Sequence, residues 1–295
     1  MSRQGVATGR GVKLSGLLNH STLTIRAFIR TDELLPMSDT ACPGCQTSRP
    51  LDFQFSMAFQ PILDIASERV WGYEALVRGL NGEGAYSILS QVSADQKYRF
   101  DQACRVKAIS LASQLFPAGE LPHLSINFLP NAVYEPSACL RATLAAARKS
   151  SFPLTSIMFE FTESEQMTDV AHLQNIIAEY RKMGFITALD DFGAGYAGLG
   201  LLADFQPDLI KIDMHLVRGI DTSRARQAIL AATLFVAREL DITVLAEGVE
   251  TAAEFAALKA AGVTLFQGYY FAKPAFETLP ALLVHPHEIG VQHVA

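Results

Sequence analysis

A regular alternation of strand-like and helix-like segments is the feature that most constrains this chain. From Phe53 onward, short runs rich in β-branched and aromatic residues are each followed by an alanine- and leucine-rich stretch with helical spacing. Strands that alternate with helices form βα units around a mostly parallel sheet. The predicted strands are 55–62, 70–76, 124–128, 157–161, 186–189, 209–212, 244–246 and 265–268.

The first two predicted strands are separated only by a short turn around Ser67 and Glu68, so we expect them to form an antiparallel hairpin. Eight strands with crossover helices in roughly 230 residues fit a closed (β/α)8 TIM-like barrel better than an open doubly wound sheet. The open sheet remains the alternative. No G-x-G-x-x-G follows a predicted strand, and the glycine-rich Gly193-Ala-Gly195 comes after two aspartates. The predicted fold class is therefore α/β, with a closed barrel that contains one antiparallel strand.

The first 50 residues differ from the rest of the chain. They have no clear apolar period, and they carry five basic residues before the first acidic one: Arg3, Arg10, Lys13, Arg26 and Arg30. We expect a poorly structured N-terminal appendage at 1–50, one catalytic domain at 51–285 and a short tail at 286–295. The pair Cys42 and Cys45 in Cys-Pro-Gly-Cys is typical either of half a zinc or redox site or of an ordinary turn with two thiols.

Charge and hydropathy exclude several classes of partner. The formal net charge is −6, with 30 acidic against 24 basic residues, and no cluster of Lys and Arg is present to bind a nucleic acid polymer or a membrane. No apolar run is long enough for a transmembrane helix or a signal peptide. Four cysteines are too few for a disulfide scaffold. These features predict a cytoplasmic protein, in which a phosphate substrate would need metal ions to reverse the local charge.

Polar residues follow the predicted strands at the point where seven of them end. These residues are Glu74, Asn127, Glu160, Asp190 with Asp191, Lys211 with Asp213, Glu247 and Gln267. In a barrel, the C-terminal ends of the parallel strands meet at one face. We therefore expect these side chains to line a single bowl.

A single acidic residue at a strand end is usually a helix cap or a solvated loop residue. Crowded carboxylates, however, repel one another and persist only around cations or in protonated form. Oxygen ligands favour Mg²⁺ or Mn²⁺ over zinc, and the adjacent Asp190 and Asp191 could serve two ions. Two neighbouring metal ions suit in-line displacement at phosphorus. The residues therefore favour a two-metal hydrolase that acts on a phosphoric ester.

The chain also resembles a known family. The segment from Tyr73 to Arg78, Tyr-Glu-Ala-Leu-Val-Arg, is similar to the signature of the EAL domain, the bacterial phosphodiesterases that linearise cyclic di-GMP. The resemblance spans roughly residues 53–280, and it continues in order through Phe59-Gln-Pro-Ile62, Asn127-Phe-Leu-Pro130, Phe159-Glu-Phe-Thr-Glu163, Asp190-Asp-Phe-Gly-Ala-Gly-Tyr196, Lys211-Ile-Asp213, Ala246-Glu-Gly-Val-Glu-Thr251 and Gln267-Gly268. The EAL triplet alone would be weak evidence, whereas this ordered set is highly specific.

The resemblance implies hydrolysis of cyclic di-GMP to linear pGpG, a (β/α)8-like barrel with one antiparallel strand, and a homodimer. It implies that two Mg²⁺ or Mn²⁺ ions are held by Glu74, Asn127, Glu160, Asp190, Asp191 and Glu247. Lys211, with Glu247 and Glu74, would carry catalysis, and Asp213 would lie in the shell of residues around the direct metal ligands. Substrate would be bound by Arg78, Leu76, Gln60 and Gln267. Glu163 would anchor the loop after Asp191.

The sequence departs from the family pattern in that loop, where Gly195-Tyr-Ala-Gly-Leu-Gly200 stands in place of a run with two serines after the tyrosine. The loop therefore has fewer hydroxyl donors and more backbone freedom than the family pattern. Some family members have lost catalysis and act as cyclic di-GMP receptors or protein-binding regulators. That alternative usually shows as a missing Glu74, Asp190, Asp191 or Lys211, and here all four are present.

Overall fold

The computed structural model describes residues 50–286 except 118, 120, 131–132, 134–138, 163–169 and 195–197. The predicted appendage up to residue 49, the Cys42 and Cys45 pair, Glu163 and the tail after residue 286 therefore lie outside the described residues. In the described part of the chain, no helix has both the length and the apolar character that crossing a bilayer requires.

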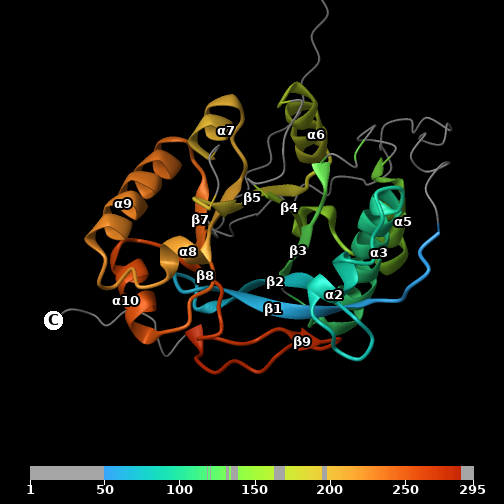
Figure 1. The fold of residues 1–295 in the computed structure, drawn as a ribbon, viewed down its shortest axis with the longest axis horizontal. Coiled ribbons are helices and arrows are strands. Elements are labelled where there is room, and N and C mark those ends of the chain that lie inside the picture. The colour runs from blue at the N-terminus through green and yellow to red at the C-terminus, as the bar shows by residue number, and fades with distance from the viewer. Residues whose placement is uncertain are drawn as a thin grey trace, which may run out of the picture. The chain divides into compact units, whose positions relative to one another are not determined.

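The strands form a closed ring, seen in Figure 1 with the helices outside it. The order is β2-β3-β4-β5-β6-β7-β8-β1, and β1 also pairs with β2, which closes the barrel. β1 is antiparallel to both of its barrel neighbours, and every other pair in the ring is parallel. The strands are β1 (Ser56–Asp64), β2 (Arg69–Arg78), β3 (His123–Asn127), β4 (Ile157–Thr162), β5 (Ile186–Phe192), β6 (Leu209–Ile212), β7 (Thr243–Ala246) and β8 (Leu265–Phe266). The predicted barrel with one antiparallel strand is confirmed.

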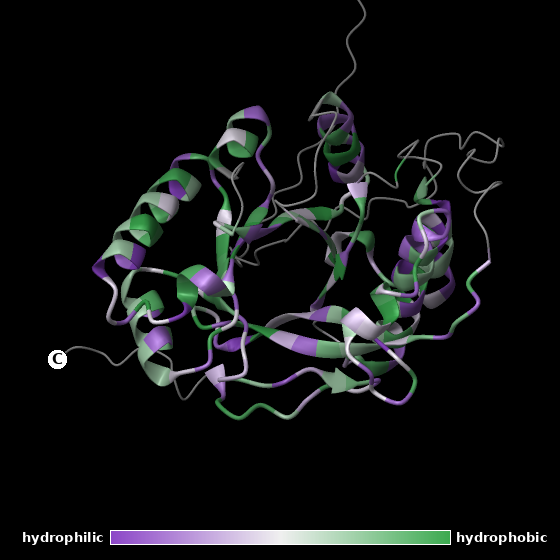
Figure 2. Cartoon of the chain, viewed as in Figure 1, coloured by the Kyte–Doolittle hydropathy of each residue, from purple (hydrophilic) through white to green (hydrophobic). Residues whose placement is uncertain are grey.

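Helices pack around the ring between successive strands (Figure 1). They mix apolar and polar residues along their length, as Figure 2 shows, and this is the pattern of helices with one buried face. Their bounds are α2 (Ala85–Leu89), α3 (Lys97–Leu115), α5 (Arg141–Ser150), α6 (Val170–Lys182), α7 (Gly198–Asp204), α8 (Met214–Val217), α9 (Arg224–Glu239) and α10 (Ala252–Ala260), with a 3₁₀ turn at Leu154–Ser156.

Two helix ends show how local sequence sets where a helix begins and stops. α10 begins with a capping box, in which the Thr251 hydroxyl accepts from the Glu254 amide and the Glu254 carboxylate accepts from the Thr251 amide. After α6, Gly184 takes a left-handed backbone with a φ of 89°, and the Phe185 amide donates to the Tyr180 carbonyl. Both ends are fixed by local sequence.

The structure corrects two features of the sequence analysis. The glycine-rich run predicted as a loop to residue 200 is already helical from Gly198, where α7 begins, because Leu201 and Leu202 become buried. A short ninth strand, β9 (Ala275–Phe276), pairs antiparallel with Ala58 and Phe59 of β1 and was not predicted. Two residues are too few to give a strand period.

The barrel interior has two levels, one apolar and one polar. The apolar level is a cluster of buried residues from six strands: Ile62, Met158, Ala188, Leu209, Leu245 and Leu265. Because side chains two residues apart along a strand share a face, the inward positions at the next level are Gln60, Glu160, Asp190, Lys211, Glu247 and Gln267. The apolar cluster therefore forms the layer of the barrel interior directly below the polar residues, and this layer is called the floor.

Candidate functional site

The centre of the polar level is Lys211, whose side chain is only 1% exposed. Its Nζ lies 2.6 Å from Glu247 Oε1, 2.9 Å from Glu160 Oε2 and 3.2 Å from Asp190 Oδ1. Glu74 Oε1 is farther away, at 3.8 Å. The structure thus brings four of the predicted acidic residues, from β2, β4, β5 and the end of β7, around one buried ammonium group.

Amide side chains complete the ring on the side of Glu74. Gln267 Nε2 donates to Glu74 Oε2 at 2.6 Å and to Gln60 Oε1 at 3.1 Å. Asn127 Nδ2 donates to Glu74 Oε1 at 3.1 Å, and Gln60 Nε2 donates to the Ala272 carbonyl at 3.1 Å. These contacts hold Glu74 from two sides and connect it to the antiparallel strand β1.

Asp190 and Asp191 reach the same bowl through an irregularity in β5. Adjacent residues of a regular strand point to opposite faces, but the pairing of β5 with β6 shifts register between Leu189 and Phe192. Asp191 has a left-handed backbone with a φ of 55°, and its amide donates to Asp190 Oδ1 at 2.8 Å. A bulge of this kind re-aims a side chain, and here both carboxylates line one cavity.

Burial sets the proton affinity of these groups. It raises the pKa of Glu160 to about 8, with Glu74 and Asp190 adding to the effect and Lys211 opposing it. Burial, and then the charges of Asp190 and Asp213, raise the pKa of Asp191 to about 6. Burial likewise raises the pKa of Glu247 well above its ordinary value. For Lys211, burial favours the neutral amine, but the surrounding carboxylates outweigh it and raise the pKa well above the usual value.

The donor set fits hard divalent cations. Five carboxyl groups, from Glu74, Glu160, Asp190, Asp191 and Glu247, accompany a single lysine. Within the described residues, Glu160 Oε1 and Gln267 Oε1 are buried without a hydrogen-bond partner. The carboxylates converge on Lys211 Nζ, and in the part of the chain that is described no group of three or more His, Cys, Asp or Glu already has the geometry of a metal centre. The site is therefore suited to a divalent cation by its oxygen donors and not by a ligand geometry that is already in place.

The site opens into a bowl of about 370 Å³, at the C-terminal ends of the parallel strands. The predicted residues Gln60, Glu74, Leu76, Asp190, Asp191, Lys211, Asp213, Glu247 and Gln267 all line it. Glu160 lies at the base, fully buried. Asp213 also caps α8, because its Oδ1 accepts from the His215 amide at 2.8 Å. Arg78, predicted to bind substrate, donates to the Val77 carbonyl at 2.7 Å in this structure and lines neither this bowl nor the cavity beside it.

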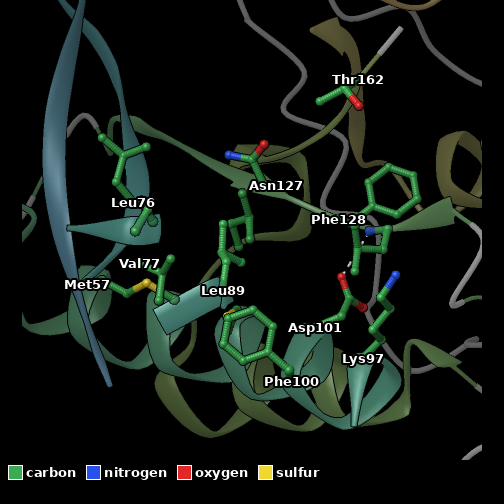
Figure 3. A pocket seen from close by; sticks show the side chains of 15 residues that line it. Met57, Leu76, Val77, Leu89, Lys97, Phe100, Asp101, Asn127, Phe128 and Thr162 are labelled. Carbon is green, nitrogen blue, oxygen red and sulfur yellow. Dashed lines mark hydrogen bonds between the residues drawn. The ribbon is translucent and has the colours of Figure 1, made fainter. Parts of the chain in front are cut away.

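A second cavity of about 490 Å³ adjoins the bowl and shares Leu76 with it. Its walls are mostly apolar, with Met57, Val77 and Leu89 near Leu76 and with Asn127 and Thr162 across from them (Figure 3). Asn127 lines the second cavity and also donates a hydrogen bond to Glu74.

Sequence reasoning missed several residues that line the bowl. Met214 and Tyr269, which are 44% and 48% exposed, stand on its rim, and Glu250 and the backbone of Gly248 and Gly268 also contribute. Each of them directly follows a predicted site residue or lies within three positions of one. Their nearness to strand ends was the available signal, and Gly248, Glu250 and Gly268 also lie within the motifs quoted above, but none was predicted as a site residue.

Comparison with known proteins places this site in a family. Residues 49–274 match the family model of the EAL domain. Among curated proteins, the chain is 32% identical over 245 residues to the blue light- and temperature-regulated antirepressor BluF of Escherichia coli, covering 83% of this chain and 60% of that protein. It is 36% identical over 230 residues to the probable cyclic di-GMP phosphodiesterase PdeG of the same organism, covering 73% of this chain and 44% of that protein. The chain thus spans about half the length of these relatives.

Solved structures give the same assignment. A standalone EAL protein from Vibrio cholerae, in its cyclic di-GMP-bound form, is 57% identical, with a TM-score of 0.76 over 79% of this chain and 97% of that one. Klebsiella pneumoniae BlrP1, in a complex with manganese and cyclic di-GMP, is 37% identical, with a TM-score of 0.71 over 78% of this chain and 58% of that one. With the barrel, the ordered motifs and a match over most of its length, the chain belongs to the EAL domain family.

Proposed function

We propose that this protein hydrolyses one phosphodiester bond of cyclic di-GMP and releases linear pGpG. The observation that carries the proposal is the convergence of Glu74, Glu160, Asp190 and Glu247 on Lys211 at the C-terminal face of the barrel. Curated relatives named as cyclic di-GMP phosphodiesterases and similar structures that contain this nucleotide support the choice of substrate.

Two divalent cations, Mg²⁺ or Mn²⁺, would be held by Glu74, Asn127, Glu160, Asp190, Asp191 and Glu247. When bound, they would supply the positive charge that attracts the phosphate and offsets the charge of the attacking and leaving oxygens. Similar structures that contain manganese or calcium support a divalent cation in this site.

The chain's own residues would orient the reaction. Lys211 would donate a hydrogen bond to the attacking water, with Glu247 beside it to accept the proton that the water loses. The water oxygen bonds to phosphorus as the bond to the 3′ oxygen breaks, and the 3′ oxygen takes up a proton, so one water is consumed for each ring opened. Gln267 and Asn127 would keep Glu74 in place, and the floor of apolar residues would exclude bulk water from below.

The test is incubation of the purified full chain with cyclic di-GMP and either Mg²⁺, Mn²⁺, Ca²⁺ or a chelator, with nucleotides separated by chromatography. We expect pGpG with Mg²⁺ or Mn²⁺, and loss of activity with Ca²⁺, whose longer and looser coordination would misplace the water. Lys211→Ala should abolish most turnover. The surface control is Lys182→Ala on α6, which should leave turnover unchanged; Lys182 pairs with Glu179 and is 64% exposed.

A second function has support from one relative. BluF is named an antirepressor rather than a phosphodiesterase, so a member of this family can be described by a regulatory role. Tight binding of cyclic di-GMP with no pGpG in either Mg²⁺ or Mn²⁺ would assign this protein to the receptors. Equal turnover in Ca²⁺ or in excess chelator would contradict the two-metal mechanism.

A further inference from the structure

At the edge of the bowl, next to Glu247 in the chain, lies a compact group of charged side chains that the proposed reaction does not use: Arg218, Glu250 and Glu254. Arg218 follows α8, and Glu254 lies in the first turn of α10. Arg218 Nη1 is 3.2 Å from Glu254 Oε1, and Arg218 Nη2 is 2.8 Å from Glu250 Oε1. Arg218 Nη2 also donates to the Gly248 carbonyl at 3.3 Å. The Arg218 guanidinium thus contacts two carboxylates and one backbone carbonyl in the segment that follows Glu247.

Glu254 is only 3% exposed, and its carboxylate is surrounded by donors. Oε2 accepts from the amides of Glu250 at 3.0 Å and Thr251 at 3.2 Å, and Oε1 accepts from the Gly219 amide at 3.1 Å. Burial would raise the pKa of Glu254, but these amides together with Arg218 outweigh it and lower the pKa. The carboxylate is therefore charged at neutral pH and holds the two loops together.

This group joins the segment that follows Lys211 to the segment that follows Glu247. Lys211 lies on β6, and Asp213, two residues later, caps α8, which ends next to Arg218. Glu247 immediately precedes Gly248, whose carbonyl Arg218 contacts. Gly248 has a left-handed backbone with a φ of 64°, and a Cβ built there would lie 2.4 Å from Met214 Cβ, so the loops pack closely.

We propose that Arg218 is a positioning residue, which with Glu254 sets the Glu247 carboxylate against Lys211 Nζ. The kinetic test of this proposal rests on the hydrolysis proposed above. The link between the two segments depends only on the contacts of Arg218 and Glu254. Groups that orient a site residue from behind typically change activity about 10- to 100-fold when they are lost. A displacement of Glu247 should lower the rate of the chemical step more than the affinity for the nucleotide.

The experiment compares Arg218→Met and Arg218→Lys with Arg181→Met in the full chain. Arg181 is a matched control, because its side chain is 42% exposed against 37% for Arg218, and it pairs with Asp208 at 2.9 Å outside both cavities. We expect Arg218→Met to lower kcat about tenfold with KM changed less than about twofold. Arg218→Lys should keep part of the rate, because it keeps the charge but not the fork of donors. Arg181→Met should leave both constants unchanged.

Hydrogen exchange read by mass spectrometry gives an independent measurement of the loop. Peptides that contain Gly248, Glu250 and Thr251 should exchange faster in Arg218→Met than in the wild type, while thermal unfolding remains cooperative in both. Arg181→Met should leave that exchange unchanged.

Three results would overturn the proposal. One is equal kinetic effects of Arg218→Met and Arg181→Met, the second is faster exchange with unchanged kcat, and the third is a rise in KM at constant kcat. If the wild type itself forms no pGpG, the proposed function fails. Unchanged hydrogen exchange in Arg218→Met would separately contradict the proposed link between the two segments.

Discussion

At the scale of single residues, the site is defined by an imbalance of buried charge. One ammonium group, Lys211, stands among carboxylates that its charge cannot neutralise. Buried carboxylates without enough positive charge take up protons or bind cations. Burial raises the pKa of Glu160 to about 8 and that of Asp191 to about 6, so protonation of these groups is favoured where no cation is bound. The same groups should therefore link pH to stability and to metal affinity.

We predict that, in a chelator, the protein loses stability as the pH rises. The folded-state pKa of Glu160 is raised to about 8 from its ordinary value of 4.5, so its contribution is fully present below 4.5 and is lost as the pH rises through about 8. The midpoint of thermal unfolding, measured between pH 5 and pH 8.5, should fall more steeply for the wild type than for Glu160→Gln. Added Mn²⁺ should reduce the fall, because it binds the deprotonated carboxylates. Parallel curves for the two proteins would contradict the assigned pKa.

A second prediction separates chemistry from binding. Lys211→Ala should lower kcat by orders of magnitude with little change in substrate affinity, because Lys211 is assigned to the attacking water. Arg78→Ala should mainly raise KM if Arg78 turns from the Val77 carbonyl to a phosphate when substrate binds. Steady-state kinetics with pGpG as the product provide the measurement. The reverse pattern would mean that the two roles are exchanged.

At the scale of elements, the positions of the strands could be predicted from the sequence, whereas irregular geometry could not. The β6 strand was predicted at its observed bounds, 209–212, because the run Leu-Ile-Lys-Ile stands between Pro207-Asp208 and Asp213. The bulge that turns Asp190 and Asp191 into one bowl depends on pairing with β6, a partner about 20 residues away. The ties from Arg218 to Gly248 and Glu254 likewise join segments about 30 or more residues apart. Local patterns contain no information on such contacts.

The C-terminal end of α6, which lies away from the site, allows a test of how much Gly184 contributes to stability. Gly184 has a φ of 89°, and a Cβ there would also approach Thr155 Cγ2 to 3.3 Å. Gly184→Ala should therefore destabilise the protein by about 1–2 kcal/mol, the cost of a left-handed backbone for a residue with a Cβ. Gly200→Ala within α7 is the control, because no atom lies within 4 Å of the added Cβ and its φ is not in the left-handed range, so it should be neutral or stabilising. Chemical denaturation measures both, and equal stabilities of the two variants would contradict the role of Gly184.

At the scale of the whole molecule, closure of the barrel makes β1 the least replaceable strand. It pairs with β2 over nine positions and also with β8 and β9, so it joins the first and last parts of the described sheet. All eight strands of the ring lie between Ser56 and Phe266. The order of strands could be predicted from the alternation of elements, but the extent of each pairing could not, because it depends on closure.

Truncation from the N-terminus should therefore have two sharply different outcomes. Removal of residues 1–40 leaves every strand of the ring in place, so we expect an unchanged midpoint of thermal unfolding and unchanged basal hydrolysis of cyclic di-GMP. Removal of residues 1–64 deletes β1, which leaves β2 and β8 with unpaired edges and removes Gln60 from beside Gln267. That shorter protein should fail to unfold cooperatively, as measured by circular dichroism and calorimetry. Loss of cooperative unfolding in the 1–40 deletion would show that the barrel needs part of the chain before the ring begins, and the predicted boundary near residue 50 would be wrong.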